Sequence, residues 1–149
     1  MKNKILISVD LSDHSTSIIQ IGVDLATKLD GNVLICSIIP VCVDYLQSQM
    51  ALIPAQWDEI YNAQKYHVIK ELNKMKAKYP GVLIEAFVEV GNAKFDIIEK
   101  AKEFIATYIV VDTHGRTGLS HKVMGSTAEY IVRHSVVPVL VVPMNRAAH

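Results

Sequence analysis

Five short runs of mostly apolar residues divide the chain at regular intervals. They cover residues 4–9, 32–39, 82–88, 108–111 and 137–142. Short runs that are almost continuously apolar are typical of strands covered on both faces, as in parallel sheets. The run at 82–88 alternates apolar and polar positions, which also indicates a strand. We therefore predict five β-strands at these positions.

The stretches between these runs carry apolar residues three and four positions apart, as on one face of an α-helix. In the first stretch, residues 18–29, a cluster of helix-capping residues precedes the apolar positions. The second is a long helix whose apolar face runs from Trp57 to Tyr79. The third predicted helix has its apolar positions at Phe95, Ile98, Ala101 and Ile105. The fourth and last helix is predicted at residues 126–134.

Strands that alternate with helices pair in parallel through right-handed crossovers. The pattern therefore predicts an α/β fold, an open five-stranded parallel sheet with helices on both faces, in one domain over residues 1–149. In such sheets, ligands bind beyond the carboxyl ends of the strands, where the strand order reverses. We expect the functional site at that edge.

Composition narrows the classes of partner. Fifteen Lys and Arg residues balance fifteen Asp and Glu residues, so we expect no nucleic acid and no membrane as partner.

The apolar run at residues 5–9 is too short for the core of a signal peptide, and we expect a cytoplasmic protein. Cys36 and Cys42 lack the spacing of redox or zinc sites and are predicted to be buried, reduced thiols.

Several common catalytic motifs are missing from the chain. It has no Walker Gly-Lys-Ser ending, no Gly-x-Gly-x-x-Gly after a strand and no Gly-x-Ser-x-Gly elbow. A P-loop NTPase, a standard dinucleotide fold and a serine hydrolase are therefore not predicted. No two of the six histidines lie three or four residues apart on one helix, the spacing of helical zinc sites. We predict no metal site formed by the protein alone.

The segment from Asp112 to Thr127 has the features of an anion site. Gly115 and Gly118 allow positive φ and close approach to a ligand, and Gly125 is expected to do the same before a helix. The N-terminus of that helix would offer N–H groups to phosphate.

Each of these features has a structural alternative. Ser126-Thr-Ala-Glu129 is also a capping-box sequence, in which Ser126 would bond the N–H groups of its own helix. Arg116 and Lys122 add positive charge near the loop, or they form a solvated face.

The segment resembles the nucleotide-binding signature of the universal stress protein family. That signature is Gly, two residues, Gly, nine residues, Gly and then Ser or Thr; Gly115 matches its second glycine and Gly125-Ser126 its end. The resemblance spans the chain, from residues 5–10 through 90–93 to 137–142. It implies a Rossmann-like fold of the adenine nucleotide alpha hydrolase type, and a dimeric, ATP-binding protein of the stress response.

The resemblance also implies where a nucleotide would be held. The residues expected at the base and ribose are Ser8, Val9, Asp10, Ile38, Val111 and Asp112. The residues expected at the phosphates, with Mg²⁺ accompanying the nucleotide, are His114, Gly115, Arg116, Gly125, Ser126 and Thr127. In the common family dimer, the last strand, here Val137 to Val142, pairs with its copy. The apolar sequence suits that role, because such a strand left as an open edge invites aggregation.

Asp112 stands where the family signature has its first glycine. A carboxylate about 5 Å from a phosphate charge, at an effective dielectric of about 20, costs roughly 3 kcal/mol, or about a hundredfold in affinity. The carboxylate could instead share Mg²⁺ with a phosphate, or accept hydrogen bonds from the ribose, which we favour because this strand end lies nearer the sugar. If ATP binding is lost, a dimeric interaction module remains. His114 is the candidate base for a third alternative, a slow ATPase.

Overall fold

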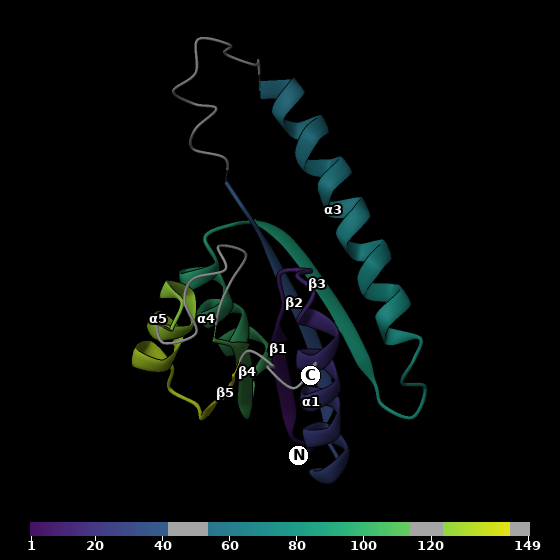
Figure 1. Ribbon diagram of the computed structural model, residues 1–149, viewed down its shortest axis with the longest axis vertical. Helices are drawn as coiled ribbons and strands as arrows, with labels where there is room; N and C mark the ends of the chain where they lie inside the picture. Colours follow the sequence, from purple (N-terminus) through teal and green to yellow (C-terminus); the bar gives the residue numbers. More distant parts are fainter. Residues whose placement is uncertain (42–53, 114–123, 144–149) are drawn as a thin grey trace.

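The computed structural model describes residues 1–41, 54–113 and 124–143. In this part of the chain, five strands form one parallel sheet in the order β3-β2-β1-β4-β5 (Figure 1). The elements are β1 (Lys4–Ser8), α1 (Ser15–Lys28), β2 (Asn32–Pro40), α3 (Pro54–Lys76), β3 (Ile84–Gly91), α4 (Ala93–Phe104), β4 (Tyr108–Asp112), α5 (Ser126–His134) and β5 (Val139–Val142). The predicted α/β fold is confirmed.

Helices cover both faces of the sheet because successive strand residues point to opposite sides. On one face, Ile7 and Ile35 belong to a buried cluster that includes residues of α1 and α3. On the other face, Leu6 and Cys36 pack with residues of α4 and α5. Figure 1 shows these two helix pairs on opposite sides of the strands. The two layers bury the central strands almost completely.

The strand order reverses between β1 and β4. From β1 the chain moves outward to β2 and β3, and it then crosses back to β4 and β5 on the other side of β1. β1 and β4 are direct neighbours, with Ile7 in register with Val110. Their carboxyl ends therefore lie together at the point where a ligand site is expected in an open α/β sheet.

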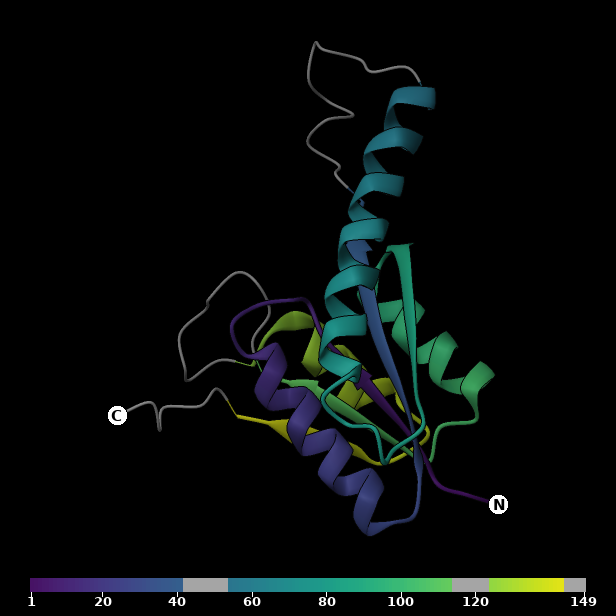
Figure 2. The same cartoon turned by 90° about the vertical axis from the view of Figure 1, so that its right-hand side faces the viewer.

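The long helix α3 packs on the sheet with its C-terminal half. The apolar face predicted from Trp57 to Tyr79 is buried at Val68 and Leu72, and the two ends of that face are half-exposed. Figure 2 shows the N-terminal turns of α3 extending past the end of the sheet. Here Trp57 stacks on Tyr61, with the ring centroids 5.7 Å apart.

Helix α4 buries only part of the predicted face. Ala101 is buried and Ile98 packs against the core, as predicted, but Phe95 and Ile105 are 51% and 63% exposed. Ile97, which was not in the predicted face, is buried. Ile105 follows the last helical turn as a C-cap with φ 56°, so the helical period no longer sets its direction. Phe95 packs edge-on against Tyr130 of α5, with the ring centroids 5.2 Å apart.

The last predicted helix is confirmed with its exact bounds, Ser126–His134. The ends of some strands were predicted wrongly. β5 begins at Val139 instead of residue 137. The hydroxyl of Ser135 donates to the Val137 carbonyl at 2.7 Å and accepts from the Val137 N–H at 3.1 Å, which holds this residue in a turn. Pro138, which follows, has no N–H for the ladder.

Candidate functional site

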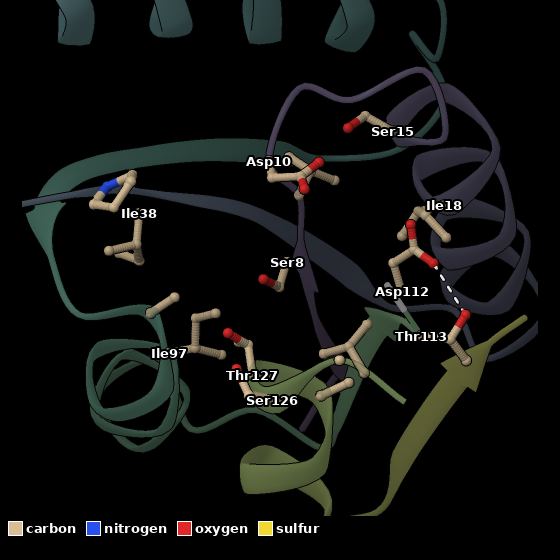
Figure 3. A pocket seen from close by; sticks show the side chains of 16 residues that line it. Ser8, Asp10, Ser15, Ile18, Ile38, Ile97, Asp112, Thr113, Ser126 and Thr127 are labelled. Atoms are coloured by element: carbon tan, nitrogen blue, oxygen red, sulfur yellow. Dashed lines mark hydrogen bonds between the residues drawn. The ribbon is translucent and has the colours of Figure 1, made fainter. Parts of the chain in front are cut away.

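A cavity of about 370 Å³ lies at the carboxyl ends of β1 and β4. Its walls come from the ends of β1, β2 and β4 and from the first turns of α1, α4 and α5 (Figure 3). The predicted site residues that line it are Ser8, Val9, Asp10, Ile38, Val111, Asp112, Gly125, Ser126 and Thr127. The other three, His114, Gly115 and Arg116, lie outside the described residues.

Asp10 lies two residues after the end of β1 and begins the turn into α1. Its Oδ1 atom accepts the N–H of Ser12 at 2.9 Å, the arrangement of an Asx turn. Leu11, between them, has a φ of 59°, a conformation that few residues other than glycine adopt. This turn directs the chain from the sheet into α1 and keeps the Asp10 carboxylate at the cavity.

Asp112 is the last residue of β4, in register with Val142 of β5. The hydroxyl of the next residue, Thr113, donates to Asp112 Oδ1 at 3.4 Å, and the N–H of Thr113 donates to the Val142 carbonyl at 3.1 Å. Figure 3 shows the Asp112 side chain on the α1 side of the cavity, across from Ser126 and Thr127. The strand end therefore directs this carboxylate away from the start of α5.

Helix α5 begins at the cavity with Gly125 as its N-cap. The N–H of Gly125 donates to the Thr113 carbonyl at 2.6 Å, which ties the helix start to the end of β4. The capping-box alternative is wrong, because Ser126 is the first helical residue and no described side chain caps this N-terminus. The positive φ expected for Gly125 is also wrong, since its φ is −60°. A helix start without a side-chain cap has N–H groups to offer an anion.

Sequence reasoning missed several residues that line the cavity. They are Ser15, Ile18, Pro40, Ala93, Ile97, Thr113 and Ala128. Ser15 is 2% exposed, and its hydroxyl has no hydrogen-bond partner among the described residues. A buried hydroxyl without a partner costs roughly 1–3 kcal/mol. One feature of the sequence could have identified Ser15 as a site residue: it lies in the polar cluster of residues 10–15, directly after the first strand. The sequence alone led us to assign that cluster only to helix capping.

The described lining of the cavity combines negative charge with hydroxyl groups. Its charged side chains are Asp10 and Asp112, and the hydroxyls belong to Ser8, Ser15, Thr113, Ser126 and Thr127. Among residues 1–41, 54–113 and 124–143, no group of three or more His, Cys, Asp or Glu side chains could hold a metal ion. No helix in these ranges is long and apolar enough to cross a membrane.

The residues that form the sheet and line the cavity all lie within a match to a protein-family model. The model of the universal stress protein family matches residues 1–143. The chain belongs to the universal stress protein family. Among curated members, the universal stress protein YxiE of Bacillus subtilis is 31% identical over 147 residues, which are 95% of this chain and 99% of that protein.

Solved structures of universal stress proteins have the same fold. UspA from Lactobacillus plantarum is 20% identical, with a TM-score of 0.79 over 94% of this chain and 97% of that chain. A universal stress protein in complex with cAMP is 19% identical, with a TM-score of 0.66 over 94% of this chain and 95% of that chain. These structures show that this universal stress protein has a Rossmann-like fold.

Proposed function

We propose that this universal stress protein binds an adenine nucleotide, ATP accompanied by Mg²⁺, in the cavity at the ends of β1 and β4. The observation that carries the proposal is that one cavity joins an apolar wall at Ile38, the carboxylate of Asp10 and the start of α5, which no described side chain caps. The related universal stress protein in complex with cAMP supports an adenine nucleotide as the ligand class.

In this proposal the base and ribose occupy the strand ends. The adenine lies against Ile38 and Val111, and the sugar lies near Ser8, Val9 and Asp10. All of these residues line the cavity, and an apolar surface with a few polar groups is the usual lining of a small-molecule site.

The phosphates are proposed to lie at the start of α5. Gly125, Ser126 and Thr127 are there, and the helix dipole favours negative charge at this end. The residues that follow β4, with Gly115 and Arg116 among them, are proposed as further phosphate ligands. Mg²⁺ would be bound through the phosphates.

Isothermal titration calorimetry with MgATP and with adenosine tests the proposal. We expect micromolar binding of MgATP by the wild type. Ser126→Glu places a negative charge at the N-terminus of α5 and should weaken MgATP binding by about tenfold or more, with little change for adenosine. Ser126 is exposed, so the substitution leaves the core intact. The matched control is Val132→Glu at another exposed position of the same helix, which should bind MgATP like the wild type.

The second candidate function is an interaction module that has lost ATP binding, and the position of Asp112 in the cavity wall favours it. In that case calorimetry shows no heat with MgATP, AMP or cAMP, and the purified protein carries no nucleotide absorbance. Asp112→Gly would then tighten MgATP binding by about a hundredfold. These results would contradict the proposed function.

We also propose that the protein is a homodimer that pairs through β5. In the described sheet, β5 is the end strand and pairs with β4 on one side. Leu140 in its middle is 40% exposed. A second copy of β5 would satisfy the open backbone edge and cover this side chain.

A further inference from the structure

The polar groups of the cavity lie at two separate sides. Figure 3 shows Asp10, Asp112 and Ser15 on one side, and Ser126 and Thr127 across from them. Carboxylates are hydrogen-bond acceptors, whereas the helix start offers N–H donors. A ligand that spans the cavity must therefore present donors or positive charge on the first side and an anion on the second.

Neutral hydroxyl donors fit the first side better than a cation does. The described lining supplies two acidic side chains there, and the described residues contain no cluster of three or more potential metal ligands. An ionised carboxylate has about four lone-pair sites. Oδ1 of Asp10 accepts the N–H of Ser12, and Oδ1 of Asp112 accepts the hydroxyl of Thr113. A carboxylate that already takes part in such bonds can accept a further hydrogen bond from a ligand hydroxyl.

Ser15 is an independent sign that a polar ligand atom belongs on this side. The residue is 98% buried, its hydroxyl has no partner in the described chain, and it lines the same cavity. Buried hydroxyls in folded proteins are normally paired. A ligand oxygen on this side would supply the missing acceptor.

We propose that Asp10 and Asp112 accept hydrogen bonds from the 2′ and 3′ hydroxyls of the ribose, and that Ser15 donates to a sugar oxygen. The inference rests on the proposed nucleotide binding and adds a specificity to it. The site selects ribonucleotides in which both hydroxyls are free. A deoxynucleotide lacks one donor, and in a 3′,5′-cyclic nucleotide the 3′ oxygen is bonded to phosphorus. Asp112 is then the specificity-determining residue at the position where the family signature has glycine.

Calorimetry with ATP, 2′-deoxy-ATP and 3′-deoxy-ATP tests this specificity. The wild type should bind ATP about tenfold or more tightly than either deoxynucleotide, the effect of one lost bond to a charged group. Asp112→Asn should weaken the binding of ATP, so that the variant's affinity for ATP is close to its affinity for a deoxynucleotide. Asp13→Asn is the control, because it removes the same charge from the loop beside Asp10 at a position that does not line this cavity. It should keep the preference for ATP.

The possible outcomes separate this inference from the proposed function. If the wild type binds ATP and both deoxynucleotides equally, the carboxylates do not recognise the ribose hydroxyls. If Asp112→Asn tightens the binding of all three, the Asp112 carboxylate faces phosphate. Either result overturns the inference and leaves nucleotide binding standing. Binding of Mg²⁺ alone that disappears in Asp112→Asn would also overturn it, because the carboxylates would form a cation site. If no adenine nucleotide binds, the proposed function and the inference fail together.

Discussion

Cys36 shows how the surroundings of one side chain determine its chemistry. The residue lies on β2 and is fully buried on the face that α4 covers. Burial raises the pKa of the Cys36 thiol to about 12 and outweighs the opposite effect of nearby Lys100. The predicted buried thiol is confirmed for Cys36, which is not in a disulfide, while Cys42 lies outside the described residues.

This pKa predicts a loss of stability in alkali. The folded protein holds the thiol proton more tightly than the unfolded chain, in which the pKa is near its ordinary value of 9.0. The contribution to stability is therefore complete below about pH 9 and falls as the pH rises toward 12, by about 1.4 kcal/mol per pH unit. Urea unfolding between pH 8 and about pH 11 should show a shallower fall in the free energy of unfolding for Cys36→Ala than for the wild type. Parallel pH profiles for the two proteins would show that the thiol does not control this loss.

At the scale of the element, close packing explains a glycine in the middle of a helix. The helix predicted in residues 18–29 is confirmed as part of α1, and its buried face includes Ile18, Ile19, Gly22 and Ala26. At Gly22 the helix crosses β1 so closely that an added Cβ atom would collide with both Cδ1 and Cγ1 of Ile7. Ile7 is fully buried in the central strand, and close-packed interiors have few voids that could take up a displaced side chain.

Gly22→Ala is therefore expected to lower the free energy of unfolding by about 1–2 kcal/mol, even though alanine has the higher helix propensity. Thermal and urea denaturation measure the change. Ile7→Ala removes both colliding atoms, so the double variant should be more stable than the sum of the two single effects predicts. Thr16→Ala, at an exposed position of α1, is the control and should change stability by less than about 0.5 kcal/mol. Additive effects of the two core substitutions would contradict the predicted collision.

At the scale of the whole molecule, the order of the strands assembles the cavity. Asp10 and Asp112 are far apart in the sequence, and they line one cavity because β1 and β4 are neighbours in the sheet. The same order places β5 at the end of the sheet. One arrangement of strands therefore creates both the candidate site and the open edge proposed for the dimer.

The proposed dimer predicts the effect of a charge in β5. Size-exclusion chromatography with light scattering should give the mass of two chains for the wild type. Leu140→Glu should give a folded monomer, because the charge would be buried between two copies of the strand. Leu83→Glu makes the same change at another exposed leucine outside β5 and should leave the dimer intact. A monomeric wild type, or a dimer that persists in Leu140→Glu, would contradict pairing through β5.

The sequence predicted the elements and the edge at which a site would form, because these depend on local patterns. Apolar runs indicated all five strands, and their alternation with helices predicted parallel pairing. The glycines and capping residues after the strands indicated which loops would lie at the carboxyl edge. Strand ends were less predictable, because turns such as the one at Ser135 depend on hydrogen bonds made by individual side chains.

The sequence by itself determined the order of strands and helices, since hydrophobic periodicity reports on neighbours along the chain. Only the tertiary structure decided which part of α3 is covered, that Gly125 rather than Ser126 is the N-cap of α5, and that Asp112 lies across the cavity from the helix start. It also decided that Ser15 is buried with an unpaired hydroxyl in the same cavity. These features depend on segments that are distant in the sequence and come together only when the sheet is assembled.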